Sequence, residues 1–133
     1  MKSHIEYPHV EDISVAIIEE EIGENSAWAV YLINQKEQPI SDVLISSRGY
    51  GRINDEDVRT SVLRHFFEQV EPKSYVRIEP IMEEMFALSN EYWVSFYQRG
   101  LIHDKKFIFL PETVSPSFFS TIPLINKRGV IIS

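Results

Sequence analysis

Residues 28–47 read WAVYLINQKEQPISDVLISS, and the fold predicted for the chain depends on this stretch. Its first six residues are all apolar or aromatic, so a strand here would be apolar on both faces, because side chains alternate along a strand. Such a strand suits the centre of a sheet. The polar run 34–38 then reverses the chain, and Pro39, which has no backbone donor, suits the entry of a second strand over residues 40–47. The stretch therefore predicts a β-hairpin.

Further segments have the alternation or the β-branched and aromatic composition of strands. Pro80 places one of them near an edge or an end of a sheet. The polar run 103–106 breaks the alternation of another, which predicts a bulge or an exposed edge there. The predicted strands are residues 13–18, 75–81, 92–97, 102–110 and 130–132, with a tight turn at 98–101.

Residues 54–70 fit two interpretations. As a helix, Asn54 would be the N-cap, and Val58, Val62, Phe66 and Val70 would recur every fourth residue. As a strand, residues 60–67 would alternate between two faces. Strands before and after, with short connections, favour the strand. Just upstream, the two glycines of residues 48–52 (RGYGR) predict a turn or a bulge.

The remaining signals are short helical ones. Residues 83–88 predict one helical turn, and Ser115-Pro116 reads as the N-cap and first position of a short C-terminal helix to about Thr121. Short strands separated by frequent turns predict a mostly β, single-domain antiparallel β-sandwich of immunoglobulin-like architecture. It would span residues 12–133 after a loose lead-in at 1–11. Trp28 and Trp93 each begin a dense strand and are expected to be buried.

The composition excludes several classes of site. The chain has 133 residues, no cysteine and a net charge of −7. Disulfides, thiolate zinc sites and cysteine nucleophiles are therefore excluded. The N-terminus lacks the apolar core of a signal peptide, and no run of 18 apolar residues occurs, so we expect no membrane span and a cytoplasmic protein. The acidic balance disfavours nucleic acid unless basic residues gather in one patch.

The sequence offers no catalytic or metal-binding motif. His4, His9, His65 and His103 lack the spacing of a transition-metal site, and His103-Asp104 has no serine in a nucleophile-elbow setting. No phosphate-binding glycine loop is present. The acidic cluster 19–21 fits a solvated strand end. We therefore expect no metal, no cofactor and no enzymatic activity.

One loop could form an interaction surface. RGYG matches the opening of the RNP1 strand of RNA-recognition domains, but the residues that follow lack its aromatic ending. Tyr50 either caps the core of the sandwich, which we favour, or contributes to binding. Together with the basic pair after His103, this loop supplies the candidate interaction residues Arg48, Tyr50, Arg52, Lys105 and Lys106.

Six segments, WAVYLIN, VLISSRGYG, LRHFFEQVEPKSYVRIEPI, NEYWVSFY, DKKFIFLPETV and IPLINKRGVII, span nearly the whole chain in order. They resemble a family of small, uncharacterised bacterial proteins typical of the Bacteroidetes. Its members are often labelled as a phenylalanyl-tRNA synthetase subunit. The arginine-bearing motifs and the size of a class II synthetase core are missing here. The resemblance implies a compact stand-alone protein and supplies no catalytic residue.

The sequence therefore predicts a non-catalytic protein-interaction or assembly module, which binds an unknown protein or associates with itself. The alternative is an RNA- or tRNA-associated accessory protein that uses the basic and aromatic loop.

Overall fold

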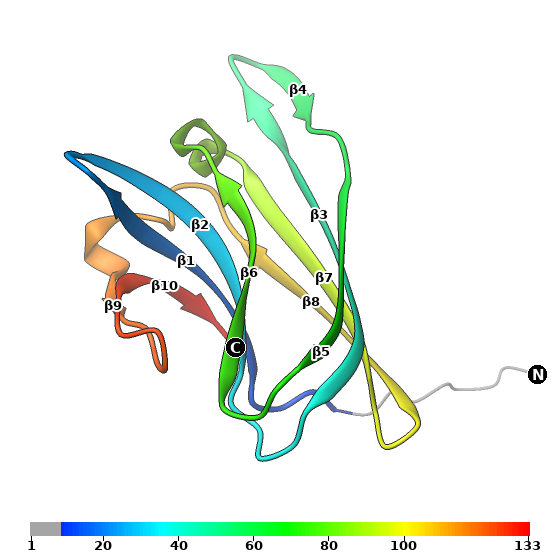
Figure 1. Cartoon of the computed structure of the whole chain (residues 1–133). Helices are drawn as coiled ribbons and strands as arrows, with labels where there is room; N and C mark the ends of the chain where they lie inside the picture. The colour runs from blue at the N-terminus through cyan, green and yellow to red at the C-terminus, as the bar shows by residue number, and fades with distance from the viewer. Residues whose placement is uncertain (1–8) are drawn as a thin grey trace, which may run out of the picture.

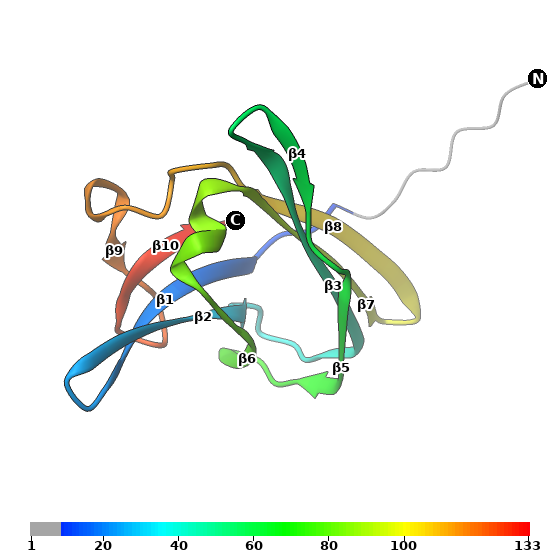
Figure 2. The ribbon, with the colours of Figure 1, turned by 90° about the horizontal axis from the view of Figure 1, so that it is seen from above.

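The computed structural model describes residues 9–133, which form two antiparallel sheets packed face to face (Figures 1 and 2). Sheet A has the strand order β6-β2-β1-β10-β9. Sheet B has the order β4-β3-β7-β8, and β5 pairs with β3. The strands are β1 (Ile13–Ile22), β2 (Asn25–Asn34), β3 (Ile40–Ile53), β4 (Glu56–Arg59), β5 (Leu63–Val70), β6 (Ser74–Ile81), β7 (Ser89–Gln98), β8 (Leu101–Phe109), β9 (Ser120–Thr121) and β10 (Arg128–Ile132). The predicted β-sandwich is confirmed.

The hairpin predicted over residues 28–47 is wrong, although both of its strands exist. β2 lies between β1 and β6 in sheet A, whereas β3 pairs with β4, β5 and β7 in sheet B. Residues 35–39 therefore carry the chain from one sheet to the other. Asn34 stabilises this crossing, because its buried amide donates to the carbonyls of Gln38, Val70 and Glu71.

β2 is apolar on both faces because both faces are covered. Trp28, Val30 and Leu32 enter the main core between the sheets, where the Trp28 ring packs against Phe86 and Phe119. Ala29, Tyr31 and Ile33 point the other way, into a second cluster on the outer face of sheet A. Ile122 and Ile125, in the segment between β9 and β10, cover this cluster, and Ile131 of β10 packs against it from within the sheet.

Residues 48–52 do not form the predicted turn or bulge, because β3 continues through them to Ile53. The turn comes at Asn54 and Asp55, which both have positive φ. Gly49 instead permits a close approach, since a Cβ there would lie 2.7 Å from the Cε of Met85.

Downstream, the strand interpretation of residues 54–70 is confirmed and the helix is wrong. The strand expected over residues 60–67 begins at Leu63 instead, as β5, and a separate short strand, β4, precedes residues 60–62.

β8 forms the edge of sheet B without a bulge. It pairs with β7 in one unbroken register from Asn90↔Phe109 to Gln98↔Leu101. The polar run 103–106 is therefore compatible with a regular strand, because its side chains alternate between the two faces. The exposed-edge alternative was correct, and the bulge was wrong.

The two segments predicted to be helical form only single turns. Residues Glu83–Ala87 form a 3₁₀ turn, η1, as predicted in outline. The C-terminal helix is shorter than predicted: the 3₁₀ turn η2 spans Pro116–Phe118, and β9 follows it at once. The Ser115 hydroxyl makes no capping hydrogen bond, which removes the support expected for a longer helix. Within residues 9–133, no helix is long and apolar enough to cross a membrane.

Two burial predictions also failed. Trp93 is 43% exposed, because only one face of β7 meets the core, through Tyr92, Val94 and Phe96. The acidic cluster 19–21, which lies within β1, is not simply solvated. Glu20 accepts the hydroxyl of Tyr31 and forms an ion pair of 3.1 Å with Arg77. The lead-in lies mostly outside the described residues, as does His4, while Val10 is buried in the main core.

Candidate functional site

The outer face of sheet B carries the most unusual surface of the described chain. Directly paired residues of an antiparallel sheet share a face, so the strand register assigns the side chains. Leu44 of β3 lies opposite Phe66 of β5 and Ser95 of β7. Tyr97 lies opposite Ile102 of β8. These side chains point away from the core. The residues between them on the same strands point into it.

Large apolar side chains are exposed along this face. Phe66 is 61% exposed, Leu44 46%, Trp93 43% and Tyr97 43%. With Ile102 they are neighbours, either directly opposite or on the diagonal, across four strands. We call these five residues the aromatic stripe. Contiguous exposed apolar side chains of this size mark interaction sites more often than isolated ones do.

The outer face of sheet A is also apolar, but it is covered by another part of the chain. Its apolar residues pair across β1 and β2, as in Ala16↔Tyr31 and Ile18↔Ala29. They are buried, because the segment around Ile122 packs over them. In Figure 1 this segment lies on the side of sheet A that faces away from sheet B. The fold thus covers one outer sheet face with its own chain and leaves the aromatic stripe on the other.

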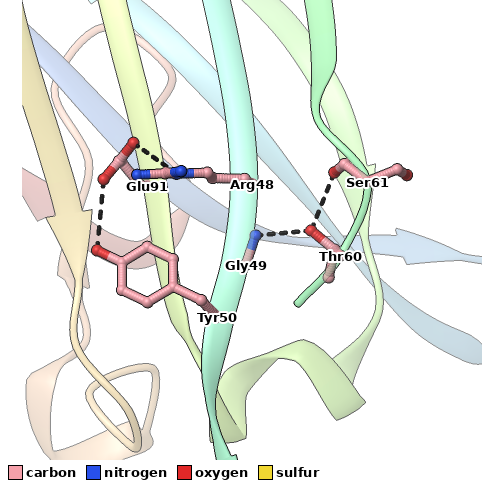
Figure 3. A network of polar contacts seen from close by, with 6 residues as sticks. All are labelled: Arg48, Gly49, Tyr50, Thr60, Ser61 and Glu91. Carbon is pink, nitrogen blue, oxygen red and sulfur yellow. Dashed lines mark hydrogen bonds and ion pairs between the residues drawn. The ribbon is translucent and has the colours of Figure 1, made fainter. Parts of the chain in front are cut away.

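Arg48 and Tyr50 point from one side of β3 toward Glu91 of β7 (Figure 3). The Nε of Arg48 donates to Glu91 Oε2 at 3.0 Å, and the Tyr50 hydroxyl donates to Oε1 at 3.3 Å. The Glu91 side chain is only 7% exposed, and its charge is balanced by Arg48. Burial, and secondly the charge of Glu91, raises the pKa of Tyr50 above its usual value. Tyr50 therefore lies on the outer face of sheet B and does not cap the core.

The basic residues of this face lie on both sides of Trp93. Across the sheet, Trp93 has Ser46 on one side, followed by Arg64, and Lys106 on the other. The Nζ of Lys106 lies 4.7 Å from the Trp93 ring centroid. Within residues 9–133, neither Arg64 nor Lys106 forms an ion pair with a carboxylate. Both charges are therefore available to a partner.

The five sequence-predicted residues are only partly brought together. Arg48, Tyr50 and Lys106 share the outer face of sheet B. Arg52 shares it too, but at the end of β3, where it is held by the carbonyl of Asp55 and the carboxylate of Asp57. Lys105 points to the opposite face, with its Nζ over the ring of Phe107. The aromatic stripe was missed, although the alternation of residues 62–66 and 92–97 could have revealed its exposed half.

A second site lies on the inner face of sheet B and was also missed. Glu79 of β6 accepts hydrogen bonds from Ser47, His65 and Tyr92, which belong to three strands of the opposite sheet. Ser47, Glu79 and Tyr92 border a cleft of about 210 Å³ that Thr60, Ser61 and Leu63 also line. Glu79 lies between the serine and the histidine, so His65 does not activate Ser47 as the histidine of a catalytic triad would.

His103 and Asp104 do not form a catalytic dyad. His103 stacks on Phe96 inside the sandwich, and its Nδ1 is 3.1 Å from the carbonyl of Leu101. Asp104 points to the other face, where it accepts from Trp93 and Ser95. Among residues 9–133, no group of three or more histidine and carboxylate side chains could hold a metal ion.

No protein-family model matches the chain, and no curated protein matches it. Among solved structures, the chain is similar to the sporulation control protein Spo0M from Bacillus subtilis. The identity is 16%, the TM-score is 0.29, and the match covers 76% of this chain and 49% of that one. The chain thus spans about half the length of Spo0M.

Proposed function

We propose that the protein is a non-catalytic interaction module of the cytoplasm that binds another protein through the aromatic stripe. The observation that carries this proposal is the contrast between the two outer sheet faces: one is covered by the C-terminal segment, and the other exposes Leu44, Phe66, Trp93 and Tyr97. Aromatic residues and arginine are enriched at the centres of protein interfaces.

The charges around the stripe specify the chemistry of the partner. Arg64 and Lys106, on either side of Trp93, have no carboxylate partner within the described residues. Asp42 and Glu68 are exposed near the other end of the stripe, beyond Leu44 and Phe66. A complementary segment would place apolar side chains on the stripe and acidic ones beside Trp93. We therefore propose an acidic, apolar-rich polypeptide segment as the occupant.

Nucleic acid fits the same surface less well. Bases stack on aromatic rings and their phosphates need cations. However, Leu44 and Ile102 offer no ring, and Asp104 lies among the exposed aromatic residues. The chain also carries a net charge of −7, which repels a phosphate backbone. RNA binding is therefore the alternative outcome of the test.

The test compares three forms of the purified protein. The double variant Phe66→Ala/Trp93→Ala removes the two anchors of the stripe. Phe118→Ala/Leu124→Ala is the matched control, because these side chains are exposed outside sheet B. Each form is immobilised and exposed to nuclease-treated lysate. Any captured protein is then purified, and its affinity for each form is measured by calorimetry.

The proposal predicts that the stripe variant loses at least about 100-fold in affinity, because each hot-spot side chain contributes about 2 kcal/mol or more. The control should bind within about twofold of wild type. A partner that binds all three forms equally would contradict the proposal. So would the lack of any saturable protein binding together with an absence of self-association in sedimentation. Binding of a short oligouridylate that the stripe variant loses would instead assign the face to RNA.

A further inference from the structure

The cleft beside Glu79 is a separate site, on the face of sheet B opposite the aromatic stripe. It is lined by residues of β6 and, on the sheet B side, by Thr60 and Ser61, which lie between β4 and β5, and by Leu63 at the start of β5. Its volume is about 210 Å³. A cavity of about 150 Å³ already accommodates benzene in another protein, so this cleft suits a compact ligand with one ring or a short apolar chain.

The polar end of the cleft holds a carboxylate that His65 balances only when its imidazole is protonated. The Glu79 side chain is only 11% exposed. Its Oε1 is 2.8 Å from the Ser47 hydroxyl and 2.7 Å from His65 Nε2, and its Oε2 accepts the Tyr92 hydroxyl at 3.3 Å. Within residues 9–133, no lysine or arginine pairs with it, and the charge of His65 depends on its protonation.

A buried carboxylate without a fixed counter-charge is costly, even when neutral groups donate to it. A carboxylate has about four acceptor sites, and three donors leave one, on Oε2. Tyr92 remains a neutral donor, because burial, and secondly Glu79, raises its pKa. The site can therefore accept one more hydrogen bond, and a positively charged donor would stabilise it most.

The walls of the cleft are mainly apolar, although Thr60, Ser61 and Asn90 also line it. Leu63, Ile81, Met82 and Met85 line it together with Pro80. Methionine side chains adapt to irregular shapes, and their sulfur atoms make favourable contacts with aromatic rings. The cleft thus combines a carboxylate at one end with deformable apolar walls.

We infer that this cleft binds a small organic cation, in which a primary ammonium group is joined to a compact apolar body. The ammonium would donate to Glu79, and the apolar body would lie between Leu63 and the two methionines. The alternative is a purely structural role, in which the polar cluster only ties β6 to sheet B. A structural cluster would show no preference among ligands of different charge.

The experiment titrates the ¹⁵N-labelled full chain with three probes of one shape: benzylamine, benzyl alcohol and benzoate. At neutral pH they are cationic, neutral and anionic. We expect saturable shifts for benzylamine in the amide resonances of residues 47–49, 61–63 and 79–82. Its affinity should lie near the millimolar range and exceed that of benzyl alcohol at least about tenfold, while benzoate should not bind.

Two variants localise the effect. Glu79→Gln keeps the size and acceptor oxygen of the side chain and should lose at least about tenfold in benzylamine affinity. Glu84→Gln makes the same change on an exposed side chain of η1 and should leave it unchanged. Equal binding of the three probes, no saturable shift at these residues, or equal affinities of both variants would overturn the inference. If Glu79→Gln does not fold, the ranking of the three probes on the wild-type protein decides alone.

Discussion

Trp93 and Lys106 lie directly opposite each other on neighbouring strands of sheet B, with the lysine Nζ 4.7 Å from the indole centroid. The indole N–H donates to Asp104 on the same face. An exposed cation–π pair contributes about 0.5–1 kcal/mol, which restrains the ring while 43% of Trp93 remains exposed. A restrained aromatic side chain loses little entropy when a partner binds, so the pair prepares Trp93 as an anchor.

The two tryptophans should differ sharply in their contribution to stability. Trp28 is 9% exposed and packs between Phe86 and Phe119, so Trp28→Ala should cost about 3–5 kcal/mol. Trp93→Ala removes a half-exposed ring and its contact with Lys106, and should cost about 1 kcal/mol. Denaturant unfolding of both variants checks this. Equal losses would mean that the inner and outer faces of β7 are assigned wrongly.

Arg48 should stabilise the fold through Glu91. Because the Glu91 side chain is 7% exposed, Arg48→Ala leaves a nearly buried carboxylate without its counter-charge. The expected cost is about 1–2 kcal/mol, reduced by the half-exposed position of Arg48. In a Glu91→Gln background the same change should cost clearly less. Arg64→Ala, on the same face, is the control and should stay within about 0.5 kcal/mol of wild type. A double-mutant cycle without coupling would contradict this role.

The ion pair of Glu20 with Arg77 should make part of the stability depend on acid pH. The hydrogen bonds from Arg77 hold the pKa of Glu20 below its usual value of 4.5. A lowered folded pKa contributes stability above the unfolded value, and this stability is lost as pH falls through the folded pKa. The destabilisation caused by Glu20→Gln should therefore be largest near neutral pH and shrink below pH 4.5. Unfolding curves recorded across this range that show a constant difference would refute it.

Tyr31 should have the opposite dependence at alkaline pH. Burial, and secondly its hydrogen bond to Glu20, raises the pKa of Tyr31 to about 12. A raised folded pKa contributes stability that is complete below the unfolded value of 10 and lost as pH rises through about 12. As pH rises from 10 to about 12, the free energy of unfolding should therefore fall less for the Tyr31→Phe variant than for the wild-type protein. Parallel alkaline unfolding curves for the two proteins would show that Tyr31 does not titrate as expected.

Gly129 permits the closest approach between backbones in sheet A. A Cβ there would lie 3.0 Å from Ile18 Cα and closer still to the Ile17 carbonyl oxygen. Gly129→Ala should therefore cost about 3 kcal/mol or more, since backbone must move. At Gly51 the nearest atom is 3.2 Å away on the side chain of Leu88, which can shift. Gly51→Ala should be clearly milder, and thermal melts that rank the two in reverse would contradict this packing.

The sequence predicted the strands better than their partners. The dense apolar, β-branched and aromatic composition of residues 13–18, 28–33 and 92–97 locates strands, because such residues are enriched in strands. The same pattern could not show that residues 35–39 cross between sheets, since the crossing depends on Asn34 reaching carbonyls near residue 70. The two glycines around Tyr50 suggested a turn, whereas Gly49 lies within β3 and leaves room for the end of the Met85 side chain.

The candidate sites were harder to predict for a related reason. Apolar residues on both faces of a strand look alike in sequence, whether a face is covered, as at Tyr31, or exposed, as at Trp93. Only the placement of Ile122 over sheet A distinguishes them. The polar cluster around Glu79 could not be predicted, because the three side chains that donate to Glu79 come from strands far apart in the sequence.

A hydroxyl-radical footprint of the protein, free and bound to its purified partner, tests directly whether the aromatic stripe is the binding surface. Oxidation of Phe66, Trp93 and Tyr97 should fall several-fold on binding, as expected for side chains at the core of an interface, while oxidation of Phe118 should be unchanged. Unchanged oxidation of Phe66 and Trp93 in the saturated complex, or protection of Phe118 instead, would contradict it.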